Sequence, residues 1–478
     1  MAKKLVFILV MVVLVAGLGI TLIILGKDDS VTTTPAYPES APMEYLVDLW
    51  GDEFGGIASL TVINSTGEYT ILGGDPPYIP GWESVISGSS PLEQLISMSS
   101  SINTQGLVAE KGANLAVYGL DHPRAELRIQ PNQGEGAVLY IGNEAPDNSS
   151  VYILKEGDGA VHRTGKWNVD MYLQGIFDFV DRTISPAGQD NGEGGFVFDR
   201  ITLGGTARTD GPVTISYIPE ETAPTGLIKN EYHISGPIET MLNMEAGYNI
   251  LKTIMGLQGD TVIARVAGDR DLAAYGLDRP YATASVSGIL GQGLGGFNLR
   301  ASKPDANGNV YIFREGTELV YQIAASTIPW IEAGWWDLMG RMVIVPFIDE
   351  VAQVEIITPA RQVAFNLSGE GSDLKVEAQG NELNSSYFRR YYQTLLAATY
   401  DEYTEERIPS GTQPFLEIVY HYRNDQRQDR LSFYGADSRR PLVSLNGNRP
   451  FYTFSSYTGK VLSDLGIILE NRNVLPYL

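Results

Sequence analysis

The chain opens with a long stretch that carries no charge. An almost wholly apolar run extends from Leu5 to Gly26, and Lys3 and Lys4 carry the only charged side chains before it. At about 1.5 Å per residue this run spans roughly 33 Å, which matches the hydrocarbon core of a bilayer. We therefore expect residues 1–27 to form a short tip followed by a transmembrane anchor.

The residues around this run predict its orientation. Because lysines favour the cytoplasmic side, the tip should be cytoplasmic, and everything after Lys27 should lie outside the plasma membrane as a single-pass protein. A cleavable signal peptide is the alternative, but its apolar stretch is usually about 7–15 residues and ends at a small-x-small site. Residues 20–25, Ile-Thr-Leu-Ile-Ile-Leu, offer no such site. The following residues 28–44 are rich in Thr, Ser and Pro, which predicts an extended stalk.

Beyond the stalk, apolar and polar residues alternate in short stretches rich in Val, Ile, Tyr and Thr. This period of two predicts strands, and Gly, Asn and Asp between the stretches predict turns. Helical periodicity appears only in residues 91–101, 238–255 and 386–398, and in the aromatic stretches 167–179 and 330–339. The pattern predicts an α+β fold of antiparallel sheets covered by helices.

The same order of elements occurs more than once, which indicates tandem repeats. A motif in the first copy, built from Tyr118, Gly119, Asp121 and Pro123, returns in the second as Tyr275, Gly276, Asp278 and Pro280. Each copy continues with a Val-Tyr-Ile stretch, at 151–153 and at 310–312. We predict repeats at 45–190 and 195–346, and a more divergent third repeat at 347–478.

The repeated motif has a structural explanation. Glycine permits a positive φ, aspartate can bond its own backbone two residues on, and proline keeps the preceding residue extended. The motif therefore predicts a turn that starts a strand rather than a ligand site. By sequence, the second copy places Leu299-Arg300-Ala301 where the first has Ile141-Gly142-Asn143.

Composition excludes several classes of protein. The 478 residues are 43% apolar and 19% charged, which excludes a disordered chain. The chain contains no cysteine, so disulfides, thiolate metal sites and cysteine nucleophiles are excluded. Its net charge of −23 has the wrong sign for binding nucleic acid through phosphates.

No motif indicates catalysis, a cofactor or a metal. The four histidines have no ligand-like spacing, and the chain lacks the nucleophile-elbow, Ser-x-x-Lys and His-Glu-x-x-His patterns. Gly291-x-Gly-x-x-Gly296 precedes a predicted strand instead of a helix, so it does not fit a dinucleotide site. Residues 305–309, Asp-Ala-Asn-Gly-Asn, resemble the start of a calcium loop but lack its later Gly and Glu. We predict no catalytic, cofactor-binding or metal-binding residue.

Two aromatic clusters are the candidate partner surface, because aromatic residues and arginine are enriched at interfaces. Helix-to-sheet packing accounts for most of their side chains, so the exposed subset is the place to look. The candidates are Trp330, Trp335, Trp336, Tyr387, Arg389, Arg390 and Tyr391.

The Tyr-Gly-Leu-Asp-x-Pro turn, the Ile-Gly-Asn segment and the Val-Tyr-Ile strand together resemble the domain-of-unknown-function 4340 family. The resemblance is strong over residues 55–345 and weaker beyond. It implies a membrane-anchored, extracytoplasmic α+β repeat protein found beside ABC-transporter components similar to those associated with gliding motility. The family has no agreed catalytic residues, so none is carried over.

These observations lead us to expect a non-enzymatic accessory protein whose partner is an ABC permease or another envelope protein. A cell-envelope polysaccharide-binding module is the first alternative. A hydrolase with an unrecognised carboxylate pair is the second, because carboxylates are plentiful and counting cannot exclude such a pair.

Overall fold

The computed structural model describes residues 44–48, 55–86, 90–187, 198–218, 231–236, 238–289, 295–423 and 427–477. These residues form two compact units, which meet in the sequence at Ile176 and Phe177; residues 84–87 belong to the second unit. The predicted tip, the anchor and all of the stalk before Glu44 lie outside the described residues. Among the helices that the structure does describe, none is long and apolar enough to cross a membrane.

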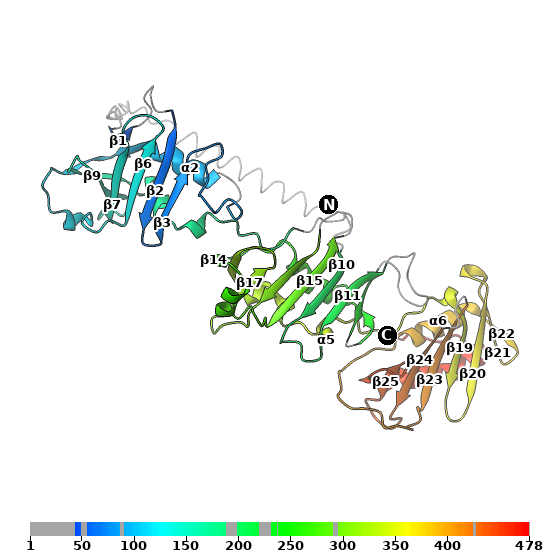
Figure 1. The fold of residues 1–478 in the computed structure, drawn as a ribbon. Coiled ribbons are helices and arrows are strands. Elements are labelled where there is room, and N and C mark those ends of the chain that lie inside the picture. Colours follow the sequence, from blue (N-terminus) through cyan, green and yellow to red (C-terminus); the bar gives the residue numbers. More distant parts are fainter. Residues whose placement is uncertain are drawn as a thin grey trace, which may run out of the picture. The chain divides into compact units, whose positions relative to one another are not determined.

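The first unit is built on a seven-stranded sheet (Figure 1). Its strands are, in pairing order, β3 (Gly67–Leu72), β2 (Ile57–Asn64), β6 (Ala125–Pro131), β7 (Ala137–Glu144), β8 (Ser150–Lys155), β9 (Val161–Gly165) and β5 (Gly106–Ala109). A separate pair joins β1 (Glu44–Asp48) to β4 (Ser101–Thr104). Helix α2 (Ser90–Ser99) contacts β2 and β4 and buries Leu92 and Leu95.

The second unit contains two larger sheets. The nine-stranded sheet has the pairing order β13 (Thr240–Met241), β12 (Glu231–Ser235), β11 (Val213–Ile218), β10 (Phe198–Gly204), β15 (Ala282–Ile289), β16 (Phe297–Ala301), β17 (Asn309–Arg314), β18 (Leu319–Ala324) and β14 (Thr261–Arg265). The eight-stranded sheet has the order β22 (Asn381–Leu383), β21 (Lys375–Ala378), β20 (Gln362–Ser368), β19 (Val351–Ile357), β23 (Leu416–Tyr422), β24 (Gln428–Tyr434), β25 (Leu442–Leu445) and β26 (Phe451–Tyr452). The α-helices described in the second unit are α3 (Ala246–Leu251), α4 (Asp269–Leu272), α5 (Trp335–Leu338), α6 (Ser385–Leu396) and α7 (Ser455–Leu469).

One pairing order recurs in the three larger sheets. The orders are β3-β2-β6-β7-β8-β9, β11-β10-β15-β16-β17-β18 and β20-β19-β23-β24-β25-β26. In each, the first strand of a hairpin pairs with a strand that follows the intervening helix, and the remaining strands form a meander. Every strand pair among the described residues is antiparallel. The predicted antiparallel α+β class and the repeat-like architecture are confirmed.

Alternation along β2 shows why these stretches become strands. Leu60 and Val62 are fully buried, while Thr61, on the opposite face, shares a 2.8 Å hydrogen bond with Thr70 of the neighbouring strand. A period of two places every second side chain on the same face of a sheet, so one face packs against α2 and its surroundings.

Three of the helix predictions are too long. Within 238–255 the chain first pairs as β13, and α3 begins only after Asn243, whose side-chain oxygen accepts the N–H of Ala246 at 2.9 Å. Stretch 330–339 contains a 3₁₀ turn and the four-residue α5, separated by Gly334. Stretch 167–179 forms only 3₁₀ turns. In these stretches the apolar residues recur with the helical period, but proline, glycine or pairing at the edge of a sheet keeps the helices short.

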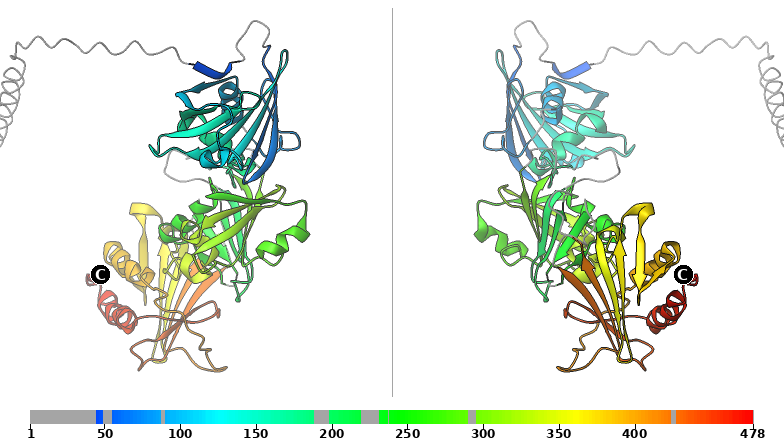
Figure 2. Two further views of the ribbon diagram at one scale, coloured as in Figure 1. Left: turned by 90° about the vertical axis from the view of Figure 1, so that its left-hand side faces the viewer. Right: turned by 90° about the vertical axis from the view of Figure 1, so that its right-hand side faces the viewer.

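The helix α7 was not predicted, because residues 455–459 combine β-formers with a glycine. It contacts α6, and Figure 2 shows the two helices beside each other on one face of the eight-stranded sheet. Phe388 of α6 packs 5.1 Å from Phe365, and Tyr457 of α7 packs 5.6 Å from Phe433, measured between ring centroids. Burial raises the pKa of Tyr457 well above its usual value.

The repeated turn has the predicted geometry in both copies. A 3₁₀ turn over Leu115–Tyr118 ends at Gly119 with φ 66°, and one over Ala273–Tyr275 ends at Gly276 with φ 67°. The strands that follow begin two residues after Pro123 and Pro280, at Ala125 and Ala282.

The apolar residues of the turn close a small core in each of these two repeats. In the first, Leu120 is buried with Leu154 and Val161, and Tyr118 packs edge-on against Tyr152 at 5.0 Å. In the second, Leu277 is buried, and Tyr275 packs the same way against Tyr311 at 5.3 Å.

The aspartate of the turn acts differently from the prediction. Its predicted partner two residues on is proline, which has no backbone N–H to donate. Instead the carboxylate of Asp121 accepts the N–H of His122, one residue on, at 3.0 Å. For Asp278 the structure gives no side-chain hydrogen bond in this turn.

The sequence alignment between the two copies was shifted by two residues. Ala125 pairs with Ile141 in the first sheet, and its equivalent Ala282 pairs with Ala301 in the second. The residue that corresponds to Gly142 is therefore Ser302 and not Arg300. Gly142 is required for packing, because a Cβ atom there would lie 2.3 Å from the carbonyl oxygen of Tyr118.

We predict that Gly142→Ala destabilises the first unit by about 1–3 kcal/mol, since the backbone of the turn must move to admit the methyl group. As a control, Gly459→Ala in α7 meets no atom within 4 Å and should stabilise by up to about 1 kcal/mol. Hydrogen exchange of the backbone amides in β6 and β7, and of those in α7, measures the two effects separately in the full chain. Unchanged exchange of β6 and β7 in Gly142→Ala would contradict this explanation.

Candidate functional site

The described surface contains a pocket of about 250 Å³ in the second unit, beside α5. Its wall comes from the loop between β10 and β11, from the segment that includes α5, and from the chain between α6 and β23. We call it the indole pocket. The lining side chains that could recognise a ligand are Arg208, Asp210, Glu332, Trp335, Trp336 and Tyr403.

Arg208 holds two of these segments together. Its Nη1 donates to the carbonyl oxygen of Gly204 at 2.8 Å, and its Nη2 donates to the carbonyl oxygens of Trp330 and Ala333. The β10–β11 loop is therefore tied to the backbone that leads into α5. Burial lowers the pKa of Arg208, and the negative charge of Glu332 opposes that shift.

The aromatic wall is a set of rings packed edge to face. Trp335 lies 5.8 Å from Trp336 and 5.5 Å from Tyr403, with interplanar angles of 82° and 65°. Phe451 stacks on Trp336 at 5.7 Å with an interplanar angle of 10°. These contacts join α5 to β26 of the eight-stranded sheet and to the chain between α6 and β23.

Two arginines already lie over these rings. The guanidinium carbon of Arg341 is 3.6 Å from the centroid of the Trp336 ring, and that of Arg449 is 4.3 Å from the Tyr403 ring. Such contacts use the negative face of the aromatic ring. Burial lowers the pKa of Arg341, although the nearby charges of Asp337 and Asp401 oppose the shift.

Two carboxylates complete the pocket, and each accepts a hydrogen bond from an aromatic side chain. Oδ2 of Asp210 accepts the indole N–H of Trp335 at 3.2 Å. Oε2 of Glu332 accepts the hydroxyl of Tyr281 at 2.8 Å, and this hydrogen bond is the largest cause of the raised pKa of Tyr281. Both carboxylates belong to exposed residues and retain free lone pairs.

The structure separates the predicted partner surface into buried and accessible parts. Trp330, Trp335 and Tyr391 are 0%, 5% and 0% exposed, so helix-to-sheet packing accounts for them. Trp336 and Tyr387 are half-buried, and Arg390 is exposed. The pocket brings together Trp335 and Trp336 but none of the α6 candidates.

The accessible α6 arginines bind their own chain. Nη1 of Arg390 donates to the side-chain oxygen of Asn473 at 2.9 Å, and Arg389 donates to the backbone carbonyl of Gly371. Sequence analysis missed the pocket residues Arg208, Asp210, Glu332 and Tyr403. No motif marks them, because the first two are more than 100 residues from the others and meet them only through the fold.

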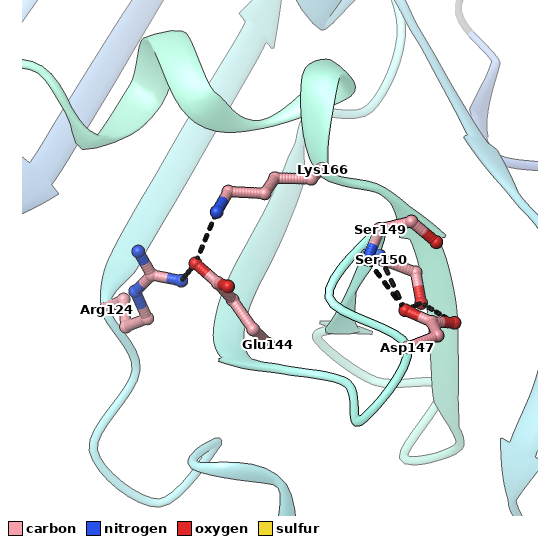
Figure 3. Close-up of polar contacts among 6 residues, drawn as sticks. All are labelled: Arg124, Glu144, Asp147, Ser149, Ser150 and Lys166. Atoms are coloured by element: carbon pink, nitrogen blue, oxygen red, sulfur yellow. Dashed lines mark hydrogen bonds and ion pairs between the residues drawn. The ribbon is translucent and has the colours of Figure 1, made fainter.

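The loop that resembles a calcium site is an ordinary turn in both repeats. Oδ1 of Asp305 accepts the N–H groups of Asn307 and Asn309 at 2.8 and 2.9 Å. Figure 3 shows the equivalent Asp147, which accepts the N–H groups of Ser149 and Ser150, both at 2.9 Å. The hydrogen bond from the Ser150 hydroxyl is the largest cause of the lowered pKa of Asp147.

A surface ion-pair cluster lies next to this turn. Figure 3 shows Glu144 between Lys166 and Arg124, with oxygen–nitrogen distances of 2.7 and 3.4 Å. The hydrogen bond from Lys166 is the largest cause of the lowered pKa of Glu144. Exposed ion pairs of this kind contribute little to stability.

The histidines lie in separate places. Nε2 of His162 is 3.2 Å from Asp158, and Nε2 of His421 is 3.4 Å from Glu355. Within the described ranges, no three His, Asp or Glu side chains are grouped as metal ligands would be. The loop that contains Gly291 and Gly293 lies outside the described residues, and the strand β16 follows it as predicted.

Comparison with known proteins identifies the family. The domain of unknown function DUF4340 matches residues 89–191 and 222–414. The chain belongs to this family. The matched residues include the repeated turn in both copies and four of the six pocket residues named above, all but Arg208 and Asp210.

No curated protein and no solved structure matches the chain. The DUF4340 family therefore supplies a relationship without an assigned activity, and the function is argued below from the site.

We predict that Arg208→Met lowers the free energy of unfolding of the second unit by at least about 2 kcal/mol, because three partly buried carbonyl oxygens lose their donor. The matched control is Arg200→Met on the exposed face of β10, which should change it by less than about 0.5 kcal/mol. Urea unfolding and hydrogen exchange of residues 205–212 measure the difference. Equal effects of the two variants would contradict the role given to Arg208.

Proposed function

We propose that this DUF4340 protein is a non-enzymatic, membrane-anchored extracytoplasmic interaction protein that serves as an accessory component of an ABC transport complex. The uncharged run from Leu5 to Gly26 supplies the anchor, and residues 28–44 hold the folded units away from the bilayer. The anchor contacts the membrane helices of the permease, and the folded units contact partners outside the plasma membrane.

The observation that carries the proposal is the indole pocket. Its side chains come from segments far apart in the chain, and Arg208 and the ring contacts hold them in fixed positions. Aromatic side chains with arginine at the centre and charged groups at the rim are the composition of protein interfaces. A cavity of about 250 Å³ suits a single side chain of a partner.

The glycan-binding alternative has one supporting observation, since Trp336 and Tyr403 line the same pocket as two carboxylates. A sugar stacks on a free ring face, however, and Arg341 and Phe451 already lie against Trp336. The hydrolase alternative also draws on this carboxylate pair. Both carboxylates accept hydrogen bonds from aromatic side chains, which supports a recognition role for the pair.

The proposal predicts that the full chain, crosslinked in its native membrane and extracted with mild detergent, is recovered together with an ABC permease. The control replaces residues 5–26 with an unrelated transmembrane helix of equal length, and it should lose most of this recovery because the anchor contacts are gone. Recovery of the native chain as a monomer alone after crosslinking would contradict the proposal.

A further inference from the structure

We propose that the first unit binds a partner protein through an apolar surface at the β5 edge of its sheet, and that the partner presents an aliphatic side chain there beside a lysine or arginine. This inference deepens the proposed function, since it rests on the chain being an interaction protein and names a surface and the chemistry of the partner. We call this surface the edge surface. Its residues are Tyr45, Leu107, Val108 and Trp167, and all four are exposed.

The two aromatic residues of the edge surface are joined through asparagines. β1 places Tyr45 opposite Asn103 of β4. The side-chain oxygen of Asn103 accepts the side-chain amide of Asn168 at 3.0 Å, and Asn168 directly follows Trp167. The 3₁₀ turn that carries Trp167 is therefore fixed against the β1–β4 pair.

The same turn also lies beside the start of β5. A Cβ atom on Gly165 would lie 2.7 Å from the indole nitrogen of Trp167 and 3.3 Å from the amide nitrogen of Gln105. The two side chains therefore meet beside Gly165. Gln105 leads directly into β5, which carries Leu107 and Val108. Residues from three segments of the first unit thus form one surface.

The apolar side chains of this surface are accessible. Trp167 is 70% exposed and Leu107 is 52% exposed. Among the described residues, no aromatic ring or guanidinium packs against the indole of Trp167, and its N–H has no hydrogen-bond partner. Grouped exposed apolar side chains mark interaction sites, and tryptophan is enriched among the residues that dominate protein–protein binding. The edge surface therefore offers a partner a free ring, which the indole pocket does not.

The backbone of β5 favours contact through side chains. β5 is the last strand of its sheet, and the described part of the chain pairs it with β9 alone. A bulge between Leu107 and Ala109 leaves Val108 out of register with β9. Bulges at an edge discourage the addition of a further strand. The partner should therefore dock its side chains on the edge surface instead of extending the sheet.

A cavity of about 400 Å³ borders the edge surface and shares Tyr45 with it. Its lining includes the exposed carboxylates of Glu44, Glu156 and Asp158, against a single lysine, Lys155. We call it the acidic groove. A partner that carries a basic side chain beside its apolar one is complementary to both features, and complementary charge favours the correct partner over others.

The same carboxylates disfavour two other occupants. A second copy of the chain would bring three further carboxylates to the interface, which costs free energy through like-charge repulsion. An anionic bilayer surface would be repelled in the same way. The charges therefore favour a different protein with a basic contact surface.

The route of the chain limits where this partner lies. The edge surface includes Tyr45 of β1, and residues 27–43 separate β1 from the predicted anchor. Seventeen residues reach about 60 Å at most when fully extended. The partner should therefore lie close to the outer face of the plasma membrane, as the extracytoplasmic loops of a permease do.

The test uses the full chain in phosphatidylcholine nanodiscs, labelled with 5-fluorotryptophan. The ¹⁹F resonance of Trp167, identified with Trp167→Phe, reports on the edge surface, and the fully buried Trp330 serves as an internal control. The probes are the amidated peptides acetyl-Leu-Lys-Val-Lys-Leu, acetyl-Leu-Glu-Val-Glu-Leu and acetyl-Ser-Lys-Ser-Lys-Ser. They are apolar and basic, apolar and acidic, and polar and basic, respectively.

We expect the apolar, basic peptide to shift the Trp167 resonance and to leave Trp330 unchanged. The other two peptides should each bind at least about fivefold more weakly, because each lacks one of the two features that are recognised. Equal binding of the acidic peptide, or no shift with the basic one, would overturn the proposal.

Two further measurements test the other occupants. A spin-labelled lipid in the nanodisc should leave the Trp167 resonance sharp, and nanodiscs with two copies should give the same Trp167 shift as nanodiscs with one. Broadening by the lipid would show that a bilayer covers the edge surface, and a shift with two copies would show that a second copy does. Either result would overturn the proposal.

Matched variants assign the binding to this surface. Leu107→Ser and Glu44→Gln should each weaken the binding of the apolar, basic peptide at least about threefold. Their controls are Leu475→Ser, which removes a 73% exposed apolar side chain of the second unit, and Glu377→Gln on β21. The controls should leave binding unchanged, and unfolding midpoints show that each variant is folded. Equal weakening by a variant and its control would overturn the assignment.

The outcome is separable from that of the proposed function. In the crosslinking experiment, Leu107→Ser with Trp167→Ser should reduce recovery of the permease at least about twofold, whereas Leu475→Ser should not. Unchanged recovery with the double variant overturns the edge surface and leaves the transport role standing. Absence of the permease with the native chain, together with intact peptide binding, overturns the transport role and leaves the edge surface standing.

Discussion

One antiparallel pairing closes each repeat. The first strand of the hairpin, β2, β10 or β19, pairs with a strand that comes after the intervening helix, β6, β15 or β23. This long-range pairing joins the two halves of each sheet and encloses the buried faces around Leu60, Ile201 and Val354. Without it, each hairpin would be an isolated two-stranded sheet, which is marginally stable at best in water.

The repeated turn leads into the strand that makes this pairing, β6 or β15, and it shows how much could be read from the sequence. Tyr118 and Tyr275 could be matched by eye, because a positive-φ glycine followed by proline leaves a strong local signal. The register beyond the turn could not be read from the sequence. Ala282 pairs with Ala301, so Ser302, and not Arg300, corresponds to Gly142. Strand alternation was reliable, while helix length failed where proline, glycine or edge pairing intervened.

The candidate site shows the limit of sequence reasoning more sharply. Trp335 and Trp336 were identified from composition, yet the burial of Trp335 and the contact of Trp336 with Arg341 follow only from three-dimensional packing. Arg208 and Asp210 carry no motif, and they reach α5 because the β10–β11 loop folds back against it. The packing that stabilises the second unit thus also builds the pocket. The recognition role that we propose therefore draws on side chains that also stabilise the fold.

Engineered disulfides test the closing pair most directly, because the native chain contains no cysteine. Opposite positions are Thr61 and Arg128, Thr202 and Ser285, and Gln353 and His421, one pair for each sheet. Opposite residues of antiparallel strands have Cα atoms about 4.5–5.5 Å apart, within the range of a disulfide. The account predicts that cysteines at all three pairs crosslink, and that cysteines shifted by one residue on one strand do not. Efficient crosslinking of the shifted pairs, or none at the opposite pairs in any sheet, would contradict it.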